Sequence, residues 1–448
     1  MSNMRLNGST KDMSTRGASS DGMNAADMHS AGVLLGHTPL RILWVKMGGL
    51  WPANSGGRLR SYHMINELSR DNDVTVLTTH SSDESTSALR AHLPYCKRID
   101  SRPFSPPKST SKAFLLSLAA SWLSRLPVDV YKYQLPELRR EVQFLLAGGN
   151  FDVCIADFMT AIPNVAMTGA TPVVFFSHNV EYMIWQRLRD NEPSWLKRVL
   201  LSIEWRKMRR AEKRACRAAV ATIAVSAEDA RKLRENCEHA HVDSVNTGVD
   251  IDYFTANSTV AKDPFAIVFS GSMDWHPNED AMLYFMKDVF QKVRAQVPEA
   301  TLSIVGRHPS QRLRTAAMLA GAEVTGTVTD IRPWLDKAAV YIVPLRIGGG
   351  TRLKIYEALS MGKAVVSTTI GAEGLSLLDD VHLLRADTTE TFVNSIVMLL
   401  KNPEMRTSLG DAGRQLMEEN YGWSKIAVQF ESLCRAAIAD KSGNAPHS

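Results

Sequence analysis

Residues 40–49 read LRILWVKMGG, an apolar run that ends in two glycines. A glycine-rich stretch continues to Gly57, a helical pattern covers residues 58–69, and a second apolar run follows at 74–79. Strand, loop, helix and strand in this order make a βαβ unit, which needs a parallel sheet. The segment therefore predicts an α/β fold for the part of the chain that begins near residue 40.

The same alternation continues along the chain in two series. The first series has strand-like runs at 153–156, 172–176, 221–225 and 241–245, and the second has them at 266–269, 301–305, 340–343 and 364–367. Helical patterns accompany the second series at 278–295, 309–320, 330–337 and 351–361. Two such series predict two doubly wound, Rossmann-like domains, which bind ligands at the carboxyl ends of their strands and in the cleft between the domains.

A polar, turn-forming stretch without periodicity, residues 246–263, marks the boundary between the two series. The predicted parts are a disordered tail (1–39), a first domain (40–245), a linker (246–263), a second domain (264–410), a C-terminal helix that crosses back to the first domain (411–438) and a disordered end (439–448).

Composition excludes several classes of protein. With 448 residues, 44% of them hydrophobic and 22% charged, the chain is globular rather than disordered or fibrous. Its five cysteines are scattered, without the spacing of a zinc site or a disulfide framework, so we expect no metal site and a reducing, cytoplasmic location. No run reaches the roughly 18 apolar residues of a membrane span. The net charge of +5 is mild and comes without a nucleic-acid-binding motif, so we expect no nucleic-acid partner.

The most informative segment is residues 344–362, PLRIGGGTRLKIYEALSMG, which lies between two strand-like runs. Gly349 and Gly350 allow the backbone to approach a ligand closely. Thr351 then begins a helix whose unpaired amides and dipole favour a phosphate group. The segment predicts a phosphate-binding turn, and a plain turn between a strand and a helix is the alternative.

Charged residues in the first turns of this helix support the phosphate prediction. Arg352 and Lys354 place cations at a helix N-terminus, where the helix dipole disfavours them unless an anion binds there. Glu357 lies on the same face as Lys354 and could accept hydrogen bonds from a ribose attached to a diphosphate. A solvated Lys–Glu pair is the alternative to this interpretation.

The segment resembles the donor-site motif of the family-four glycosyltransferases of the GT-B fold. The resemblance extends over about residues 40–435 and implies a retaining, metal-independent enzyme that uses a nucleotide-diphosphate sugar and no cofactor. It implies that the first domain takes the acceptor and the second the nucleotide sugar. Glu357 and Ala358 match the family's second motif glutamate, which holds the ribose, whereas Gly349 stands where the first glutamate is expected. The sequence GGGTRLK is similar to the branch found in capsule and exopolysaccharide synthesis.

Other loops resemble donor-binding loops of the same family. In residues 268–280, VFSGSMDWHPNED, Ser272 stands where the family carries a basic residue, so we expect Arg352 and Lys354 to supply the missing charge. The resemblance further places donor contacts in a first glycine-rich loop and two base-binding loops, at Gly48, Gly49, Gly56, Gly57, Arg307, Gly326 and Val328. A flexible loop without a ligand is the alternative at residues 48–57.

His178, in the segment FFSHNVE (175–181), follows a buried strand. It matches the family's histidine that faces the donor sugar near the reacting centre, so we predict a catalytic role together with Lys354 and Arg352. A neutral imidazole there could bind a sugar hydroxyl or the developing charge. A histidine satisfied within its own loop is the alternative.

A basic stretch at 195–219 holds nine Lys and Arg against two Glu. Its apolar residues gather at the beginning, and a basic amphipathic helix of this kind can lie on anionic lipid. A solvated helix that packs by one side is the alternative. The residues predicted to face a membrane are Arg206, Lys207, Arg209, Arg210 and Lys213.

The sequence therefore predicts a retaining glycosyltransferase of glycan synthesis, cytoplasmic or peripheral at the inner face of the plasma membrane. Its partners would be a nucleotide-sugar donor, a saccharide or lipid-linked saccharide acceptor and an anionic membrane surface. Two alternatives stay open: a nucleotide-sugar epimerase of the same fold, and a degenerate binding or scaffold subunit. The latter is suggested by Gly349 and Ser272, which depart from the family pattern.

Overall fold

The structure of the protein, a computed structural model, describes residues 38–53, 55–81, 86–107, 111–347 and 353–443. The segments 1–37 and 444–448, which belong to the predicted disordered ends, lie outside these ranges. Residues 439–443 were also expected to be disordered, but they continue the last helix.

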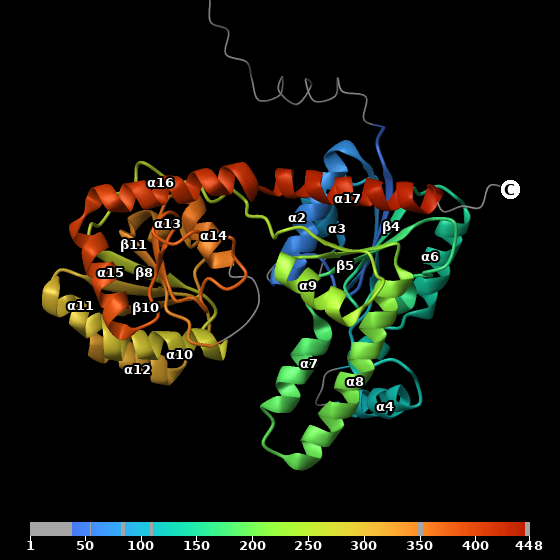
Figure 1. Cartoon of the computed structure of the whole chain (residues 1–448), viewed down its shortest axis with the longest axis horizontal. Coiled ribbons are helices and arrows are strands. Elements are labelled where there is room, and N and C mark those ends of the chain that lie inside the picture. The colour runs from blue at the N-terminus through green and yellow to red at the C-terminus, as the bar shows by residue number, and fades with distance from the viewer. Residues whose placement is uncertain (1–37, 54, 82–85, 108–110, 348–352, 444–448) are drawn as a thin grey trace, which may run out of the picture. The chain divides into compact units, whose positions relative to one another are not determined.

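The first domain is built on a seven-stranded parallel sheet with the strand order β3-β2-β1-β4-β5-β6-β7 (Figure 1). The central strands are buried on both faces, so they occur in the sequence as unbroken apolar runs. The strands are β1 (Arg41–Lys46), β2 (Asp73–His80), β3 (Arg98–Pro103), β4 (Val153–Asp157), β5 (Val173–Ser177), β6 (Ala221–Ala224) and β7 (Val242–Ser244).

Side chains of this sheet alternate between separate apolar cores on its two faces. Ile42 and Trp44 join one core, whereas Leu43 and Val45 join another. The helices of this part of the chain are α2 (Gly56–Asp71), α3 (Thr86–His92), α4 (Lys112–Trp122), α5 (Val128–Tyr131), α6 (Pro136–Ala147), η1 (Ile162–Asn164), α7 (Glu181–Asp190), α8 (Trp195–Ala218) and α9 (Ala227–Asn236).

The second domain has a six-stranded parallel sheet with the order β10-β9-β8-β11-β12-β13, which repeats the order of the first sheet when counted from β8. Its strands are β8 (Ala266–Ser270), β9 (Thr301–Val305), β10 (Glu323–Gly326), β11 (Val340–Val343), β12 (Ala364–Ser367) and β13 (Leu384–Arg385). The prediction of two Rossmann-like domains is therefore confirmed.

Helices between these strands fall near the predicted ranges. The helix expected at 278–295 begins at His276 and contains one π-helical turn, η2. The helices are α10 (His276–Tyr284), η2 (Phe285–Phe290), α11 (Gln291–Gln296), α12 (Gln311–Ala320), α13 (Arg332–Lys337), α14 (Leu353–Ser360) and α15 (Thr389–Lys401).

The end of the chain forms two helices, α16 (Pro403–Asn420) and α17 (Trp423–Gly443), where one was predicted at 411–438. The aromatic side chain of Phe430 on α17 lies 5.7 Å from Trp44 and 5.0 Å from Phe176, measured between ring centroids. Helix α17 therefore completes the apolar core of the first domain, although it follows the second domain in the sequence.

Each sheet reverses its strand order between two central strands, β1 and β4 in the first domain and β8 and β11 in the second. Doubly wound sheets bind ligands beyond the carboxyl ends of the strands at this point. Within the described ranges, no helix is both long enough and apolar enough to cross a membrane.

Candidate functional site

Five of the predicted site residues lie just after the carboxyl ends of strands. In the first domain, Gly48 and Gly49 follow β1, and His178 follows β5. In the second domain, Ser272 follows β8 and Arg307 follows β9. The structure therefore places these residues at the ligand-binding edge of each sheet.

The loop after β1 is held by two hydrogen bonds to its first glycine. Gly48 and Gly49 have φ angles of 89° and 79°, a left-handed region that few residues other than glycine adopt. The Gly48 amide donates to Thr79 Oγ1 at 2.9 Å, and Arg58 Nη2 donates to the Gly48 carbonyl at 2.8 Å. The Arg58 guanidinium consequently places positive charge against this loop.

Gly56 and Gly57 begin α2 but have different surroundings. A β-carbon added to Gly56 would meet nothing within 4 Å, whereas one on Gly57 would lie 2.5 Å from Cζ of Phe158. The close approach that Gly57 permits is thus to a ring of the protein itself. Phe158 has a φ of 72°, which is strained for a bulky side chain.

His178 belongs to a buried cluster of charged and aromatic residues that was not predicted from the sequence. Its side chain has no exposed surface, and its Nε2 lies 2.8 Å from Oδ1 of Asp157. The ring of Phe158 stacks on the imidazole, with the centroids 3.8 Å and the planes 17° apart. Lys46 completes the cluster, with its Nζ 3.5 Å from the other carboxylate oxygen of Asp157.

The cluster of Lys46, Asp157 and His178 has a signal in the sequence that could have revealed it. Lys46 and Asp157 are the last residues of the otherwise apolar strands β1 and β4. The parallel register places these two residues directly opposite each other. A charged residue that ends a buried strand is rarely left without a partner.

Electrostatics give the residues of this cluster different protonation states. Burial lowers the pKa of His178 to about 4, because the loss of solvation outweighs the attraction of Asp157. Burial alone would raise the pKa of Asp157, but Lys46 and His178 outweigh it and hold the pKa at about 2. At neutral pH the carboxylate is therefore ionised and the imidazole is neutral.

In the second domain, Lys354 on α14 is oriented by residues of β8 and α10. Its Nζ donates to Oδ1 of Asn278 at 3.0 Å and lies 4.2 Å from the centroid of the Phe269 ring. Asn278 also donates through Nδ2 to the Ser272 carbonyl at 2.8 Å. Asn278 lies inside α10, which begins at His276, and its side-chain amide links Lys354 to the loop after β8.

The loops after β8 and β9 approach each other through two glycines. A β-carbon on Gly271 would lie 2.7 Å from Lys354 Nζ, and one on Gly306 would lie 1.7 Å from the Gly271 carbonyl oxygen. Only glycine lets these two backbones and the lysine ammonium come together. The ammonium of Lys354 thus lies close to the backbone of Gly271, at the edge of the sheet where ligands bind.

Ser272 and Arg307 meet at the same edge of the second sheet. Arg307 Nε donates to Ser272 Oγ at 2.8 Å, and Ser272 Oγ in turn donates to the carboxylate of Asp274. The guanidinium of Arg307 is exposed. Arg307 therefore supplies positive charge next to the position where the family's basic residue is replaced by Ser272.

Glu357 lies partly buried on α14, close to one turn beyond Lys354. Burial raises the pKa of Glu357 to about 7, with Lys354 acting in the opposite direction. A carboxyl group with such a pKa changes its charge in the physiological range, as functional carboxyl groups often do.

Four of the predicted site residues belong to a segment that the structure does not describe. Gly349, Gly350, Thr351 and Arg352 lie outside the described residues. Gly326 ends β10 with a φ of 74°.

The side chain of Val328 packs against the core of the second domain, so any ligand contact of Val328 would come from its backbone. Asp330 accepts a hydrogen bond from the Arg332 amide at 2.9 Å, but the N-cap residue of α13 is Ile331.

Helix α8 carries the basic stretch, and its two acidic residues are buried. Glu204 accepts hydrogen bonds from the Val128 amide at 2.7 Å and from Trp122 Nε1 at 3.2 Å. Glu212 accepts from the Glu181 amide at 2.8 Å, at the start of α7. Because both carboxylates are buried and accept hydrogen bonds inside the protein, the exposed ionisable side chains of α8 are all basic.

The five predicted membrane-facing residues do not share one environment. Lys207 is partly buried and donates to the Ser121 carbonyl at 2.6 Å, Arg209 donates to Asn236 at 2.8 Å, and Lys213 pairs with Glu238 at 3.8 Å. Arg206, Arg209 and Arg210 are exposed. Arg206 also donates to the Ser202 carbonyl of its own helix at 3.4 Å, so exposure and contacts within the protein overlap in this set.

Exposed apolar side chains accompany this basic helix and extend to α4, which was not predicted. Figure 1 shows α7 and α8 side by side, with α4 next to α8. The exposed fraction is 94% for Leu123, 72% for Leu116 and 71% for Trp195. We call this set the α4/α8 surface: Leu115, Leu116, Trp122, Leu123, Trp195, Leu196, Val199 and Leu200.

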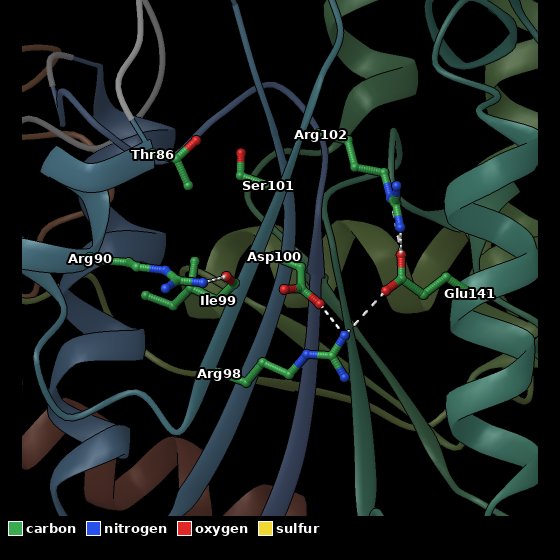
Figure 2. A pocket seen from close by; sticks show the side chains of 8 residues that line it. All are labelled: Thr86, Arg90, Arg98, Ile99, Asp100, Ser101, Arg102 and Glu141. Atoms are coloured by element: carbon green, nitrogen blue, oxygen red, sulfur yellow. Dashed lines mark hydrogen bonds and ion pairs between the residues drawn. The ribbon is translucent and has the colours of Figure 1, made fainter.

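Side chains of the first domain line two hollows. One contains His178 together with Arg60, Asn179 and Ser226, at the carboxyl edge of the sheet, and residues of the second domain such as Trp275 also line it. The other, of about 350 Å³, lies at α3, β3 and α6, and Figure 2 shows Arg98, Asp100, Arg102 and Glu141 directed toward one another.

In this second hollow, Arg98 contacts Asp100 and Glu141, and Arg102 contacts Glu141, while Arg90 donates to the Ile99 carbonyl (Figure 2). Arg98, Asp100, Arg102 and Glu141 are thus paired with one another, so we place the candidate site instead at the carboxyl ends of the strands.

Comparisons with known proteins match both domains. Residues 55–253 match the family model described as Glycosyltransferase Family 4, and residues 264–402 match the one described as Glycosyl transferases group 1. An uncharacterised 44.6 kDa protein in the cps region of Klebsiella pneumoniae is 21% identical over 86% of this chain and 97% of its own length.

Solved structures of similar fold include two that span nearly the whole chain. HepE from Anabaena in complex with UDP is 14% identical with a TM-score of 0.61, over 89% of this chain and 100% of its own. A sucrose-phosphate synthase from Thermosynechococcus elongatus is 16% identical with a TM-score of 0.63, over 89% of this chain and 99% of its own. At these identities the likeness establishes the fold, which is GT-B.

Proposed function

We propose a reaction from one premise: the chain belongs to the family-four glycosyltransferases of the GT-B fold. The proposed reaction moves a sugar from a nucleotide-diphosphate donor to a saccharide or lipid-linked saccharide acceptor, with retention of configuration and without a metal. The relative in the cps region supports a place in the synthesis of a surface polysaccharide.

The observation that carries this proposal is the position of Lys354. Its ammonium is held by the Asn278 oxygen and the Phe269 ring, near the backbone of Gly271 at the carboxyl end of β8. A cation oriented in this way can stabilise the charge that develops on a departing diphosphate. Arg352, two residues before it in the sequence, would add a second cation.

Glu357 and His178 complete the proposed donor site. Glu357 would accept hydrogen bonds from the ribose hydroxyls, which are stronger when its carboxyl group is ionised. His178, neutral at physiological pH, would interact with a hydroxyl of the donor sugar near the reacting carbon. In this mechanism the protein contributes orientation and electrostatic stabilisation rather than a nucleophile.

The experiment that tests this function is incubation of the purified protein with a panel of nucleotide sugars and saccharide or lipid-linked acceptors. Release of nucleoside diphosphate together with a glycosylated acceptor is the expected result. Epimerised donor without transfer would identify the epimerase alternative, and binding of donor without any turnover would identify the scaffold alternative. Either of these results would reject the proposed transfer.

A second part of the proposal concerns location: the α4/α8 surface rests on an anionic bilayer at the cytoplasmic face. Its exposed apolar side chains are flanked on α8 by the exposed cations Lys197, Arg198, Arg206 and Arg210. Apolar burial combined with attraction to anionic headgroups is the mode of interfacial helices. Such a position would bring the site near a lipid-linked acceptor.

Vesicle flotation tests this location. Reversal of charge at Lys197, Arg198 and Arg206, or Leu116→Glu with Leu196→Glu, should each reduce recovery with anionic vesicles. A matched control reverses the exposed cations of the second domain at Lys287, Lys292 and Arg312. Equal loss in the control, or no flotation of the unaltered protein, would contradict the proposed membrane surface.

A further inference from the structure

Two buried charged residues, Lys46 and Asp157, have no role in the function proposed so far. Lys46 is 2% exposed and Asp157 is fully buried. They end neighbouring strands in direct register, at the edge of the sheet where His178 follows β5. Burial of a charge is costly unless it is paired, so a pair retained at this edge calls for an explanation beyond stability.

Both carboxylate oxygens of Asp157 lie close to nitrogen atoms of other side chains. Trp44 Nε1 donates to Oδ2 at 2.9 Å, and Lys46 Nζ lies 3.5 Å from the same oxygen. His178 Nε2 lies 2.8 Å from Oδ1. The attraction of Lys46 and His178 outweighs burial and keeps the pKa of Asp157 at about 2, so the carboxylate is ionised and can only accept.

The proton of the neutral imidazole must therefore reside on Nε2. The contact between His178 and Asp157 is short but falls outside ideal hydrogen-bond angles. Nevertheless, an unprotonated nitrogen at 2.8 Å from a carboxylate oxygen would set two lone pairs against each other. With the pKa of His178 lowered to about 4 by burial, no second proton is bound at neutral pH.

The ring of His178 is also fixed in orientation. Phe158 stacks on one face, and Lys46 Nζ lies 4.1 Å from the centroid of the Phe158 ring, so the cation contacts both the carboxylate and the stacked ring. The remaining imidazole nitrogen, Nδ1, is buried and has no polar partner in the described part of the chain. A buried acceptor without a donor costs about 1–3 kcal/mol, which a ligand hydroxyl can recover.

We propose that Lys46 and Asp157 are positioning residues that hold His178 in its neutral Nε2–H tautomer, so that Nδ1 accepts a hydrogen bond from a hydroxyl of the donor sugar. This inference rests on the proposed transfer function. In this tautomer Nδ1 carries no proton, so His178 binds a hydroxyl and does not donate a proton to the departing diphosphate.

The tautomer can be measured without any substrate, by nitrogen-15 NMR of protein labelled at the imidazoles of its twelve histidines. Comparison with His178→Gln assigns the signals. The expected result at neutral pH is a protonated Nε2 and an unprotonated Nδ1 for His178. A proton on Nδ1 would overturn the inference, whether or not the protein transfers sugar.

Two carboxylate substitutions at opposite ends of β4 make the test specific. In Asp157→Asn, an amide that can donate replaces the acceptor, so the proton of His178 should move to Nδ1. Asp152→Asn is the matched control, because Asp152 immediately precedes β4 and pairs with Arg41 at the opposite end of the strand. An unchanged tautomer in Asp157→Asn, or a changed one in the control, would contradict the proposal.

Kinetics test whether Asp157 acts through His178. We expect Asp157→Asn to lower kcat/KM by about 10- to 100-fold and His178→Ala to lower it at least as much. The double variant should lose no more than His178→Ala alone, because residues that act as a unit are not additive. Losses that multiply in the double variant would reject a positioning role, even with transfer activity established.

Discussion

Two lysines at the ligand-binding edges of the two sheets illustrate two uses of a positive charge. Lys46 ends a strand of the first domain, is buried, and lies against the carboxylate of Asp157. Lys354 lies on the first helical turn after a strand of the second domain, is only partly buried, and is held by an amide oxygen and an aromatic ring. The first charge lies beside a buried carboxylate, whereas the second is held by neutral groups, at the position where we propose that the donor diphosphate binds.

The largest effect is expected when Lys46 loses its buried counter-charge. Asp157→Ala leaves Lys46 and His178 buried beside a space without a counter-charge, so we expect a loss of about 3–5 kcal/mol in the free energy of unfolding. Denaturant unfolding measures it. Asp152→Ala, which removes a solvent-exposed pair with Arg41, is the control and should have a much smaller effect. Similar losses in both variants would show that the buried pair of Lys46 and Asp157 stabilises the protein no more than the exposed pair of Arg41 and Asp152.

The next prediction concerns the ammonium group of Lys354 in the second domain. Lys354→Ala removes a cation from the proposed diphosphate site, so we expect transfer to fall about 10²- to 10³-fold, as for the loss of one stabilising donor. The melting temperature should change little, since the Lys354 side chain is only partly buried. The control is Lys292→Ala, an exposed lysine of the same domain. A large drop in melting temperature together with lost activity would assign Lys354 a structural role instead.

A third prediction concerns pH and separates Glu357 from the buried Asp157. Because the pKa of Glu357 is raised to about 7 in the folded protein, its contribution to stability is fully present below about pH 4.5 and is lost as the pH rises through 7. The stability difference between the wild type and Glu357→Gln should therefore change by up to about 3 kcal/mol between pH 5 and pH 8. The same ionisation should strengthen nucleotide binding over this range.

Unfolding at several pH values for both proteins, with nucleotide binding measured alongside, checks the Glu357 prediction. A pH-independent stability difference would mean that Glu357 is ionised throughout, and would remove the proposed titration.

The smallest expected effect compares two adjacent glycines at the start of α2. Gly57→Ala would bring a methyl group to within 2.5 Å of the Phe158 ring that stacks on His178, so we expect a destabilisation of about 1–3 kcal/mol. Gly56→Ala meets nothing within 4 Å and should be neutral or slightly stabilising. The melting temperatures of the two variants are compared. Equal values would mean that the Phe158 ring can move away from the added methyl group at little cost in free energy.

The two halves of the site also differ in how far the sequence reveals them. The proposed phosphate-binding segment of the second domain is contiguous in the sequence, and the spacing within one helix is enough to predict that Lys354 and Glu357 lie on the same face. The α/β class and the two parallel sheets followed equally well from alternating apolar runs.

The polar cluster of the first domain cannot be predicted from the spacing within one segment, because Lys46 and Asp157 end two separate strands and His178 follows a third. Only the register of the parallel sheet brings them together. The exposure of the α4/α8 surface likewise depends on tertiary packing. An apolar helix such as α4 gives no indication in the sequence of whether its face will be covered.

The central claim is that the second domain binds the donor diphosphate at Lys354 while the first domain acts later, at the sugar. Calorimetric titration with UDP, GDP and ADP tests it most directly. The account predicts that at least one of them binds the wild type, that Lys354→Ala binds it at least tenfold more weakly, and that Asp157→Asn binds it with unchanged affinity. Equal affinity in the wild type and Lys354→Ala would contradict the claim.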